Sequence, residues 1–171
     1  MTDVTDKYGK WMFFGAWIVI LVLLTLYFSG MLEKKYNPNQ SPISIVNGDI
    51  AEVVLLRNRM GHYIASGEIN DVPVTFLLDT GATNVVIPAH LGNKLNLQPG
   101  KRSQARTANG VVTVADTNIN ELTLSDIRLI NVDASLNPGM RGDEILLGMS
   151  VLKYLELTQK GDALILRAEM P

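Results

Sequence analysis

Several kinds of chemistry are missing from this 171-residue sequence, beginning with cysteine, of which it has none. That absence excludes disulfides and thiol nucleophiles and leaves the redox compartment open. Histidine is scarce too: His62 and His90 are the only two, and their spacing does not suit a metal centre. We therefore expect neither a metal nor another cofactor. No serine stands in a Gly-x-Ser-x-Gly motif, although a dispersed Ser-His-Asp triad stays open.

An excess of positive charge is also absent. From residue 36 onward, eleven Lys and Arg residues stand against fourteen Asp and Glu residues, a net charge of −3. A nucleic-acid-binding surface needs a basic stripe that neutralises phosphates, and the sequence offers none. Nucleic acid is therefore not expected as a partner.

Charge is missing altogether from residues 11–32, which Lys10 precedes and Glu33-Lys34-Lys35 follows. An apolar helix of this length spans the roughly 30 Å hydrocarbon core of a bilayer, so we predict a transmembrane segment. A cleaved signal peptide is the alternative, but its apolar part is usually only about 7–15 residues long. The small pair Ser29-Gly30 also follows bulky Tyr27-Phe28, which makes a poor cleavage site. We interpret the segment as an uncleaved signal anchor.

The rest of the chain divides around this anchor. Residues 1–10 form an N-terminal tail, residues 33–47 a linker, and residues 48–171 a single domain. The stretch from Tyr36 to Pro42 is polar and contains two prolines, as a tether would. Lysines on the two sides of the anchor balance each other, so charge alone does not fix which side of the membrane the domain occupies.

The domain has the sequence pattern of β structure. Short apolar or alternating runs are separated by turn residues, which is typical of an all-β sandwich or barrel and not of alternating βαβ units. The runs are residues 53–56, 62–65, 72–78, 111–115, 127–132 and 163–166, and the turns are residues 59–61, 70–71, 109–110, 125–126 and 160–162. Two stretches break the pattern: residues 88–95 predict a helical turn that begins with proline, and residues 150–155 a short helix.

The most informative motif is Asp79-Thr80-Gly81, which ends the apolar run of residues 74–78. A buried strand that ends in a carboxylate, a hydroxyl and a glycine suits a catalytic turn. The hydroxyl can hold the loop by a hydrogen bond, and the glycine lets the backbone turn sharply and approach a second copy of itself. Asp and Gly also favour ordinary turns, so the tripeptide alone is weak evidence.

Two carboxylates about 3 Å apart share a single proton, so that one activates water while the other protonates the scissile carbonyl. The chain offers one good candidate, Asp79. The similar Asp116-Thr117-Asn118 also follows an apolar segment, but Asn118 replaces the glycine, and we assign this tripeptide to a strand end or a turn. The second carboxylate must then come from another copy of the chain, and a two-fold axis would bring both copies of Asp79 together. This chemistry predicts a homodimer.

Three segments, taken in order along the chain, resemble one protein family. Leu77-Leu78-Asp79-Thr80-Gly81-Ala82 and Ile145-Leu146-Leu147-Gly148 look like the paired motifs of the retropepsin-like (clan AA) aspartic proteases, and Thr107-Ala108-Asn109-Gly110 lies between them. Asn-Gly is a strong hairpin signal, and this family carries its flap at that place. Together with Gly148-Met149-Ser150-Val151-Leu152, the order most resembles the membrane-anchored bacterial members, over about residues 48–168 plus the anchor.

The resemblance implies an all-β, retropepsin-like closed β barrel with one short helix, preceded by a single N-terminal transmembrane helix. It also implies roles for individual residues. The catalytic residue is Asp79, and its loop is supported by Thr80, Gly81 and Ala82. The flap over the substrate is formed by Thr107, Ala108, Asn109 and Gly110, and the element behind the loop by Leu146, Leu147 and Gly148. For a bacterial member we expect a single-pass protein of the inner membrane with a periplasmic protease domain. Two features depart from the pattern, because the flap has one glycine where retroviral flaps are glycine-rich, and Met149 follows Gly148 where a polar or basic residue is usual.

Two functions of different classes fit these observations. The first is a membrane-anchored aspartic endopeptidase that cleaves protein or peptide substrates as a homodimer. The second is a membrane-tethered module on the same fold that binds a peptide or a partner protein without hydrolysis, since a fold does not by itself imply a function. The intact Asp79-Thr80-Gly81 favours the enzyme, because a pure binder does not need a carboxylate at a symmetry axis.

Overall fold

The computed structural model describes residues 3–107 and 110–169, which form two compact units that divide after Tyr36. The first unit is a single helix, α1 (Asp3–Tyr36), and its part from Trp11 to Tyr36 is long and apolar enough to cross a membrane. The hydroxyl of Thr25 donates to the Leu21 carbonyl at 2.7 Å, and that of Ser29 donates to Leu26 at 2.9 Å. The polar side chains of the apolar stretch thus satisfy their own hydrogen bonds, as a lipid environment requires.

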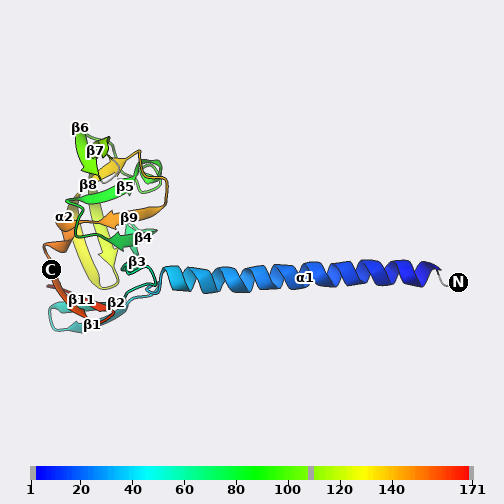
Figure 1. Cartoon of the computed structure of the whole chain (residues 1–171). Coiled ribbons are helices and arrows are strands. Elements are labelled where there is room, and N and C mark those ends of the chain that lie inside the picture. Colours follow the sequence, from blue (N-terminus) through cyan, green and yellow to red (C-terminus); the bar gives the residue numbers. More distant parts are fainter. Residues whose placement is uncertain (1–2, 108–109, 170–171) are drawn as a thin grey trace. The chain divides into compact units, whose positions relative to one another are not determined.

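The second unit consists mainly of β-strands, as the sequence predicts (Figure 1). Its described helical elements are a 3-10 turn, η1 (Ala89–Leu91), and a short α-helix, α2 (Met149–Leu152). The strands are β1 (Ile43–Asn47), β2 (Ile50–Leu56), β3 (Ile64–Ile69), β4 (Val72–Leu78), β5 (Val85–Pro88), β6 (Arg102–Thr107), β7 (Gly110–Leu124), β8 (Ile127–Asn137), β9 (Glu144–Leu147), β10 (Glu156–Lys160) and β11 (Ala163–Glu169).

Seven of these strands form one sheet in the order β3-β4-β9-β5-β8-β7-β6, which can be followed along the domain in Figure 1. Strand β3 also pairs with β7, through Glu68–Thr123 and Ile69–Leu122. This pairing closes six strands into a barrel and leaves β6 outside the ring. Strand β9 lies between β4 and β5, parallel to the first and antiparallel to the second. The predicted closed β barrel is confirmed.

The remaining four strands form a second sheet, in the order β1-β2-β11-β10. It joins the start of the domain to its end, because β2 pairs with β11 over seven residues. The Arg167 guanidinium on β11 donates to the Glu52 carboxylate on β2 at 2.7 Å and lies 3.8 Å from Glu156 on β10. The hydrogen bond from Arg167 to Glu52, together with the negative charge of Glu52, raises the pKa of Arg167. Three neighbouring strands are thus linked on their exposed face.

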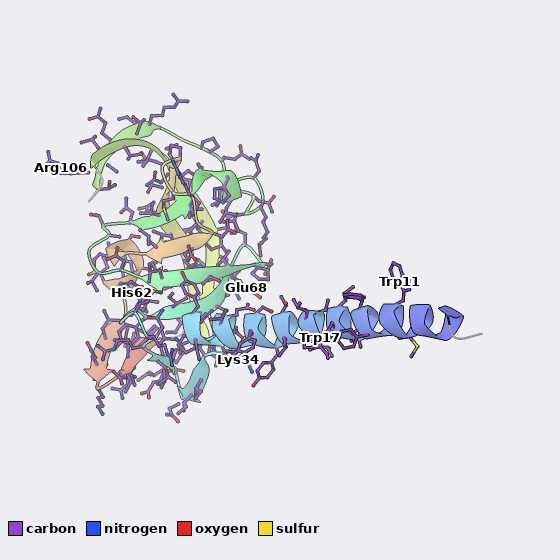
Figure 2. All side chains as sticks on the ribbon, turned by 45° about the vertical axis from the view of Figure 1, so that its right-hand side comes forward. Trp11, Trp17, Lys34, His62, Glu68 and Arg106 are labelled. Carbon is purple, nitrogen blue, oxygen red and sulfur yellow. The ribbon has the colours of Figure 1, made fainter. Side chains whose placement is uncertain are left out.

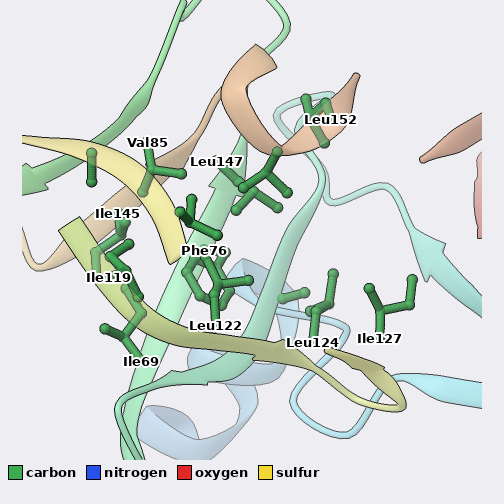
Figure 3. Packing of buried hydrophobic residues seen from close by; sticks show 14 of the residues in the cluster. Ile69, Phe76, Val85, Ile119, Leu122, Leu124, Ile127, Ile145, Leu147 and Leu152 are labelled. Carbon is green, nitrogen blue, oxygen red and sulfur yellow. The ribbon is translucent and has the colours of Figure 1, made fainter. Parts of the chain in front are cut away.

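The core of the domain lies inside the barrel and continues to the second sheet, whose Val53, Leu55 and Leu166 are fully buried in the same cluster. Phe76 on β4 is fully buried, and Figure 3 shows its ring among Ile69, Ile119, Leu122 and Leu147. These side chains come from four different strands, so the packing holds the barrel closed.

Residues 33–39 are more ordered than the predicted linker implies. Helix α1 includes Tyr36, and the next residues fold onto the domain. Asn39 is buried: its side-chain amide donates to the carbonyls of Leu56 (2.9 Å) and Ile64 (2.6 Å) and accepts from the Leu56 amide (2.7 Å). Asn37 is also buried and donates to Ser66 on β3 at 3.0 Å. The predicted tether therefore carries two polar residues that fasten it to β2 and β3.

One assignment made from the sequence is wrong. Asp116-Thr117-Asn118 is not a strand end or a turn, because it lies inside the 15-residue strand β7. Asp116 pairs there with Ser135, and Asn118 with Asp133. The apolar alternation that marks β7 weakens at these polar residues, which is why the strand seemed to end there.

Candidate active site

Strand β4 delivers Asp79 to the surface of the barrel. The Asp79 amide donates to the Leu147 carbonyl on β9 at 3.1 Å, which continues the β4–β9 pairing by one residue. One Asp79 carboxylate oxygen, Oδ1, accepts a hydrogen bond of 2.8 Å from the Gly81 amide, and the Asp79 carbonyl accepts from Ala82 at 3.2 Å. The backbone thus turns tightly around the carboxylate and holds it at the mouth of the loop.

The loop is fixed from behind by the end of β9 and the start of α2. The amide of Met149 donates to the Ala82 carbonyl, and the amide of Ser150 donates to the Thr83 carbonyl, both at 2.8 Å. Gly148 passes so close to the loop that a Cβ atom there would lie 2.6 Å from the Ala82 carbonyl oxygen and 2.2 Å from that of Asn84. Only glycine fits, because both obstacles are backbone atoms that cannot rotate away.

Strands β6 and β7 form a hairpin that faces the loop. Their pairing closes at Thr107 and Gly110, and the Thr107 hydroxyl donates to the Gly110 carbonyl at 2.8 Å. The predicted flap residues Ala108 and Asn109 lie outside the described residues. The hairpin and the Asp79 loop together line one cavity of about 730 Å³. A cavity of this size between a carboxylate and an exposed hairpin can take an extended peptide.

The structure brings most of the predicted site residues together. Leu146 lines the cavity, Leu147 holds the Asp79 amide, and Gly148 packs against the loop. Thr80 is exposed, and its hydroxyl has no hydrogen-bond partner among the described residues, so within one chain it does not hold the loop. Thr80 is the one predicted support residue without a described contact.

Sequence reasoning missed Ser150, which braces the loop from α2. Its hydroxyl accepts from the Val85 amide at 3.0 Å and donates to the Asp133 carbonyl at 3.2 Å, so it joins β5, β8 and the loop. The signal was present, since a hydroxyl next to an expected helix start favours hydrogen bonds to nearby backbone.

The cavity contains a second carboxylate of this chain, Asp116 on β7. The Asp79 carboxylate accepts from the Gly81 amide and the Asp116 carboxylate accepts from the Ser103 hydroxyl. Among the described residues, no hydrogen bond joins these two carboxylates.

An Asp-Thr-Gly loop backed by a Leu-Leu-Gly strand and faced by a hairpin defines an aspartic protease fold. The chain belongs to the family described as gag-polyprotein putative aspartyl protease, whose sequence model matches residues 65–154. This match confirms the resemblance to retropepsin-like proteases that the motifs predict.

Similar proteins come from bacteria. A crystal structure of a retropepsin-like aspartic protease from Rickettsia conorii is similar with a TM-score of 0.58 and 25% identity, covering 75% of this chain and 94% of that one. An uncharacterized protein in the cobV 5′ region of a Sinorhizobium species is 28% identical over 166 residues, which is 90% of this chain and 71% of the relative. An uncharacterized protein of Rickettsia prowazekii is 24% identical over 81% of this chain and 63% of its own length.

Proposed function

We propose that this protein is a membrane-anchored aspartic endopeptidase that acts as a homodimer. The observation that carries the proposal is the Asp79 loop, a carboxylate held by its own backbone at the edge of a peptide-sized cavity. Membership of the aspartic protease family supports the same activity.

In the proposed mechanism, Asp79 of each subunit supplies one carboxylate, and the pair holds one proton. The ionised carboxylate takes a proton from water, and the protonated one donates to the carbonyl of the peptide bond. A partner from a second chain is supported because Asp79 and Asp116 have separate hydrogen-bond partners, and no hydrogen bond joins the two carboxylates among the described residues. The exposed hydroxyl of Thr80 would brace the partner's loop, and Gly81 and Ala82 would allow the close approach.

The hairpin would cover the substrate. In this proposal, residues 107–110 lie over the peptide, and main-chain groups of the exposed strand β6 pair with it as an added strand. The alternation of side chains along an extended peptide would then give specificity through the pockets beneath it.

Helix α1 would serve as a single-pass anchor. Its apolar length supports this role, and in this proposal the helix lies in the inner membrane with the protease domain in the periplasm. Confinement to a surface raises the effective concentration of subunits, so a weak dimer in solution becomes a competent one in a membrane.

The test of the activity is Asp79→Asn in the full-length protein. This change keeps the size of the side chain and its hydrogen bond from Gly81, so we expect an unchanged melting temperature and a loss of peptide cleavage of at least about 100-fold. Asp126→Asn, which removes an exposed carboxylate from the β7–β8 turn, is the matched control and should cleave as wild type. Wild-type cleavage should peak in acid, since a pair that shares one proton works only between two pH limits.

Cleavage by Asp79→Asn at the wild-type rate would show that Asp79 is not catalytic. A wild-type protein that binds peptides but cleaves none between pH 3 and 8 would instead indicate the non-hydrolytic binding module.

The test of the dimer is dilution of a soluble form that begins at Tyr36. This start keeps Asn37 and Asn39, which are buried in the domain and would be lost from a shorter form. We expect activity per subunit to fall on dilution in parallel with dissociation measured by sedimentation. The full-length protein in vesicles should resist the loss at the same bulk concentration. A monomer with full activity at every concentration would exclude the shared pair of carboxylates.

A further inference from the structure

The floor of the active-site cavity changes character along its length. Strand register places Leu146, Val86, Ser135 and Asp116 side by side on the neighbouring strands β9, β5, β8 and β7. All four line the cavity that contains Asp79. The floor is therefore apolar near Asp79, polar in the middle and acidic at its far end.

At the acidic end of the floor, hydrogen bonds fix Asp116 to the base of the hairpin. The Ser103 hydroxyl donates to Oδ1 of Asp116 at 3.1 Å, and the backbone of Asp116 exchanges hydrogen bonds with Gly100 and Lys101 at the base of β6. Over residues 3–107 and 110–169, Asp116 forms no ion pair, and its side chain is exposed. A fixed carboxylate without a cation is thus turned toward the cavity.

The basic residues of the hairpin do not form an ion pair with Asp116. Cross-strand partners share a face of a sheet, and the pairs Ser103–Val114 and Ala105–Val112 lie on the face of Asp116. Arg102 and Arg106 alternate with these residues and lie on the other face. Figure 2 shows the Arg106 side chain projecting from the outer end of the hairpin. Arg106 also lines the cavity, at the tip end of β6, but among the described residues it forms no ion pair with Asp116 at the base of the hairpin.

The middle of the floor has unused hydrogen-bonding capacity. Ser135 is 6% exposed, and its hydroxyl has no partner in the described part of the chain although it lines the cavity. Asn137, two residues further on the same face, uses its carbonyl oxygen to accept from Gly139 at 2.8 Å. The Ser135 hydroxyl can therefore donate to or accept from a polar group of a ligand in the cavity.

Asp79 and Asp116 line the same cavity, from the loop after β4 and from β7. One extended peptide that fills this cavity would therefore contact both, with the cleaved bond at Asp79 and a basic side chain at Asp116.

We propose that Asp116 is a specificity residue, which binds a Lys or Arg side chain of an extended peptide whose apolar residues lie over Leu146 and Val86. This inference rests on the proposed protease function and adds a substrate class to it: peptides with an apolar cleavage site and a basic residue a few positions away.

The experiment uses full-length protein in detergent and dodecapeptides with a central Leu-Leu pair and randomised flanks. Mass spectrometry of the products identifies the flanking position at which Lys and Arg are most enriched, and a matched pair of peptides is then made with Lys or Gln there. For wild type we expect kcat/KM to be about tenfold higher for the Lys peptide, mainly through KM. Asp116→Asn should remove this preference and leave the Gln peptide within twofold, while Asp126→Asn should keep it.

Affinity is measured in parallel with the Asp79→Asn protein, so that the site is tested without cleavage. If wild type cleaves peptides without a basic preference, or if Asp116→Asn slows both peptides equally, the inference is wrong and the protease function stands. A third outcome separates the two proposals. Wild type cleaves no peptide, yet the Asp79→Asn protein binds the Lys peptide about tenfold more tightly than the Gln peptide, and adding Asp116→Asn removes this difference. The binding site at Asp116 then stands and the protease function is wrong. Absence of both cleavage and preferential binding overturns the inference.

Discussion

The Asp79 loop and the β6–β7 hairpin face each other across one cavity, yet they are held in opposite ways. The loop donates a hydrogen bond to β9 through the Asp79 amide and accepts two from the start of α2, and Gly148 leaves no free space behind it. The hairpin is an edge of the seven-stranded sheet, and beyond its base β6 pairs only with β7. Val111, near the tip of this hairpin, is exposed.

This difference assigns the two sides different mechanical properties. A catalytic carboxylate must be held within fractions of an ångström, which the packed loop achieves. A cover must open to admit a peptide, and segments with few buried contacts open at little cost in free energy. Substitutions that disturb the packing behind the loop should therefore change stability, whereas those in the hairpin should change substrate affinity.

The strongest test of the comparison is Gly148→Ala against Gly110→Ala. The first places a Cβ atom within 2.6 Å of two backbone oxygens, so we expect a loss of about 3 kcal/mol or more in the free energy of unfolding. Gly110 has open space around it but a φ of +114°, so alanine there should cost only about 1 kcal/mol through local strain. Urea unfolding of both variants measures the difference, and equal losses would contradict the rigid loop.

A smaller effect is expected from Ser150→Ala. The change leaves the Val85 amide without its acceptor and should cost about 1–2 kcal/mol. Because the loop shifts when β5 is released, kcat should fall more than KM rises. Ser41→Ala, at an exposed position, is the control, and thermal unfolding with steady-state kinetics is the measurement. A change in KM alone would place Ser150 outside the support of the loop.

The smallest change in stability is expected from Thr107→Val in the hairpin. It removes the hydrogen bond to the Gly110 carbonyl at an exposed site, and the melting temperature should fall by less than about 2 °C. KM should rise about two- to threefold while kcat stays constant, because the cover closes less well over the peptide. Thr113→Val, on the outer face of the same hairpin, should leave both constants unchanged. A large loss of stability in Thr107→Val would show that the hairpin is as firmly held as the loop.

The loop was predictable from the sequence for a physical reason. Asp79-Thr80-Gly81 ends an apolar run, which predicts a turn at the end of a buried strand. In the Leu-Leu-Gly segment, Gly148 is the small residue that close packing against this turn requires. The residue types and their places along the chain therefore indicate the same structure. The left-handed turn at Asn70 and Asp71, with φ of 50° and 64°, was readable in the same way.

Features that depend on distant strands were not predictable. The position of Asp116 on the cavity floor follows from its register with β8, which local alternation does not contain. Asn39 looks like part of a polar tether, and its burial follows from backbone groups of Leu56 and Ile64 that become its partners only in the folded domain. Strand β9 has four residues and is recognisable as a strand only between β4 and β5.

The parallel pairing of β4 with β9 also constrains when the site can exist. Leu78 pairs with Leu147, so the support of the Asp79 loop is made late in synthesis, after most of the chain has left the ribosome. Pairings between distant segments are slow to form, since the chain entropy of closing a long loop must be overcome first. The nascent chain therefore carries Asp79 without a finished loop until Leu147 has been made, and in the proposed protease this order of folding would keep an immature chain inactive.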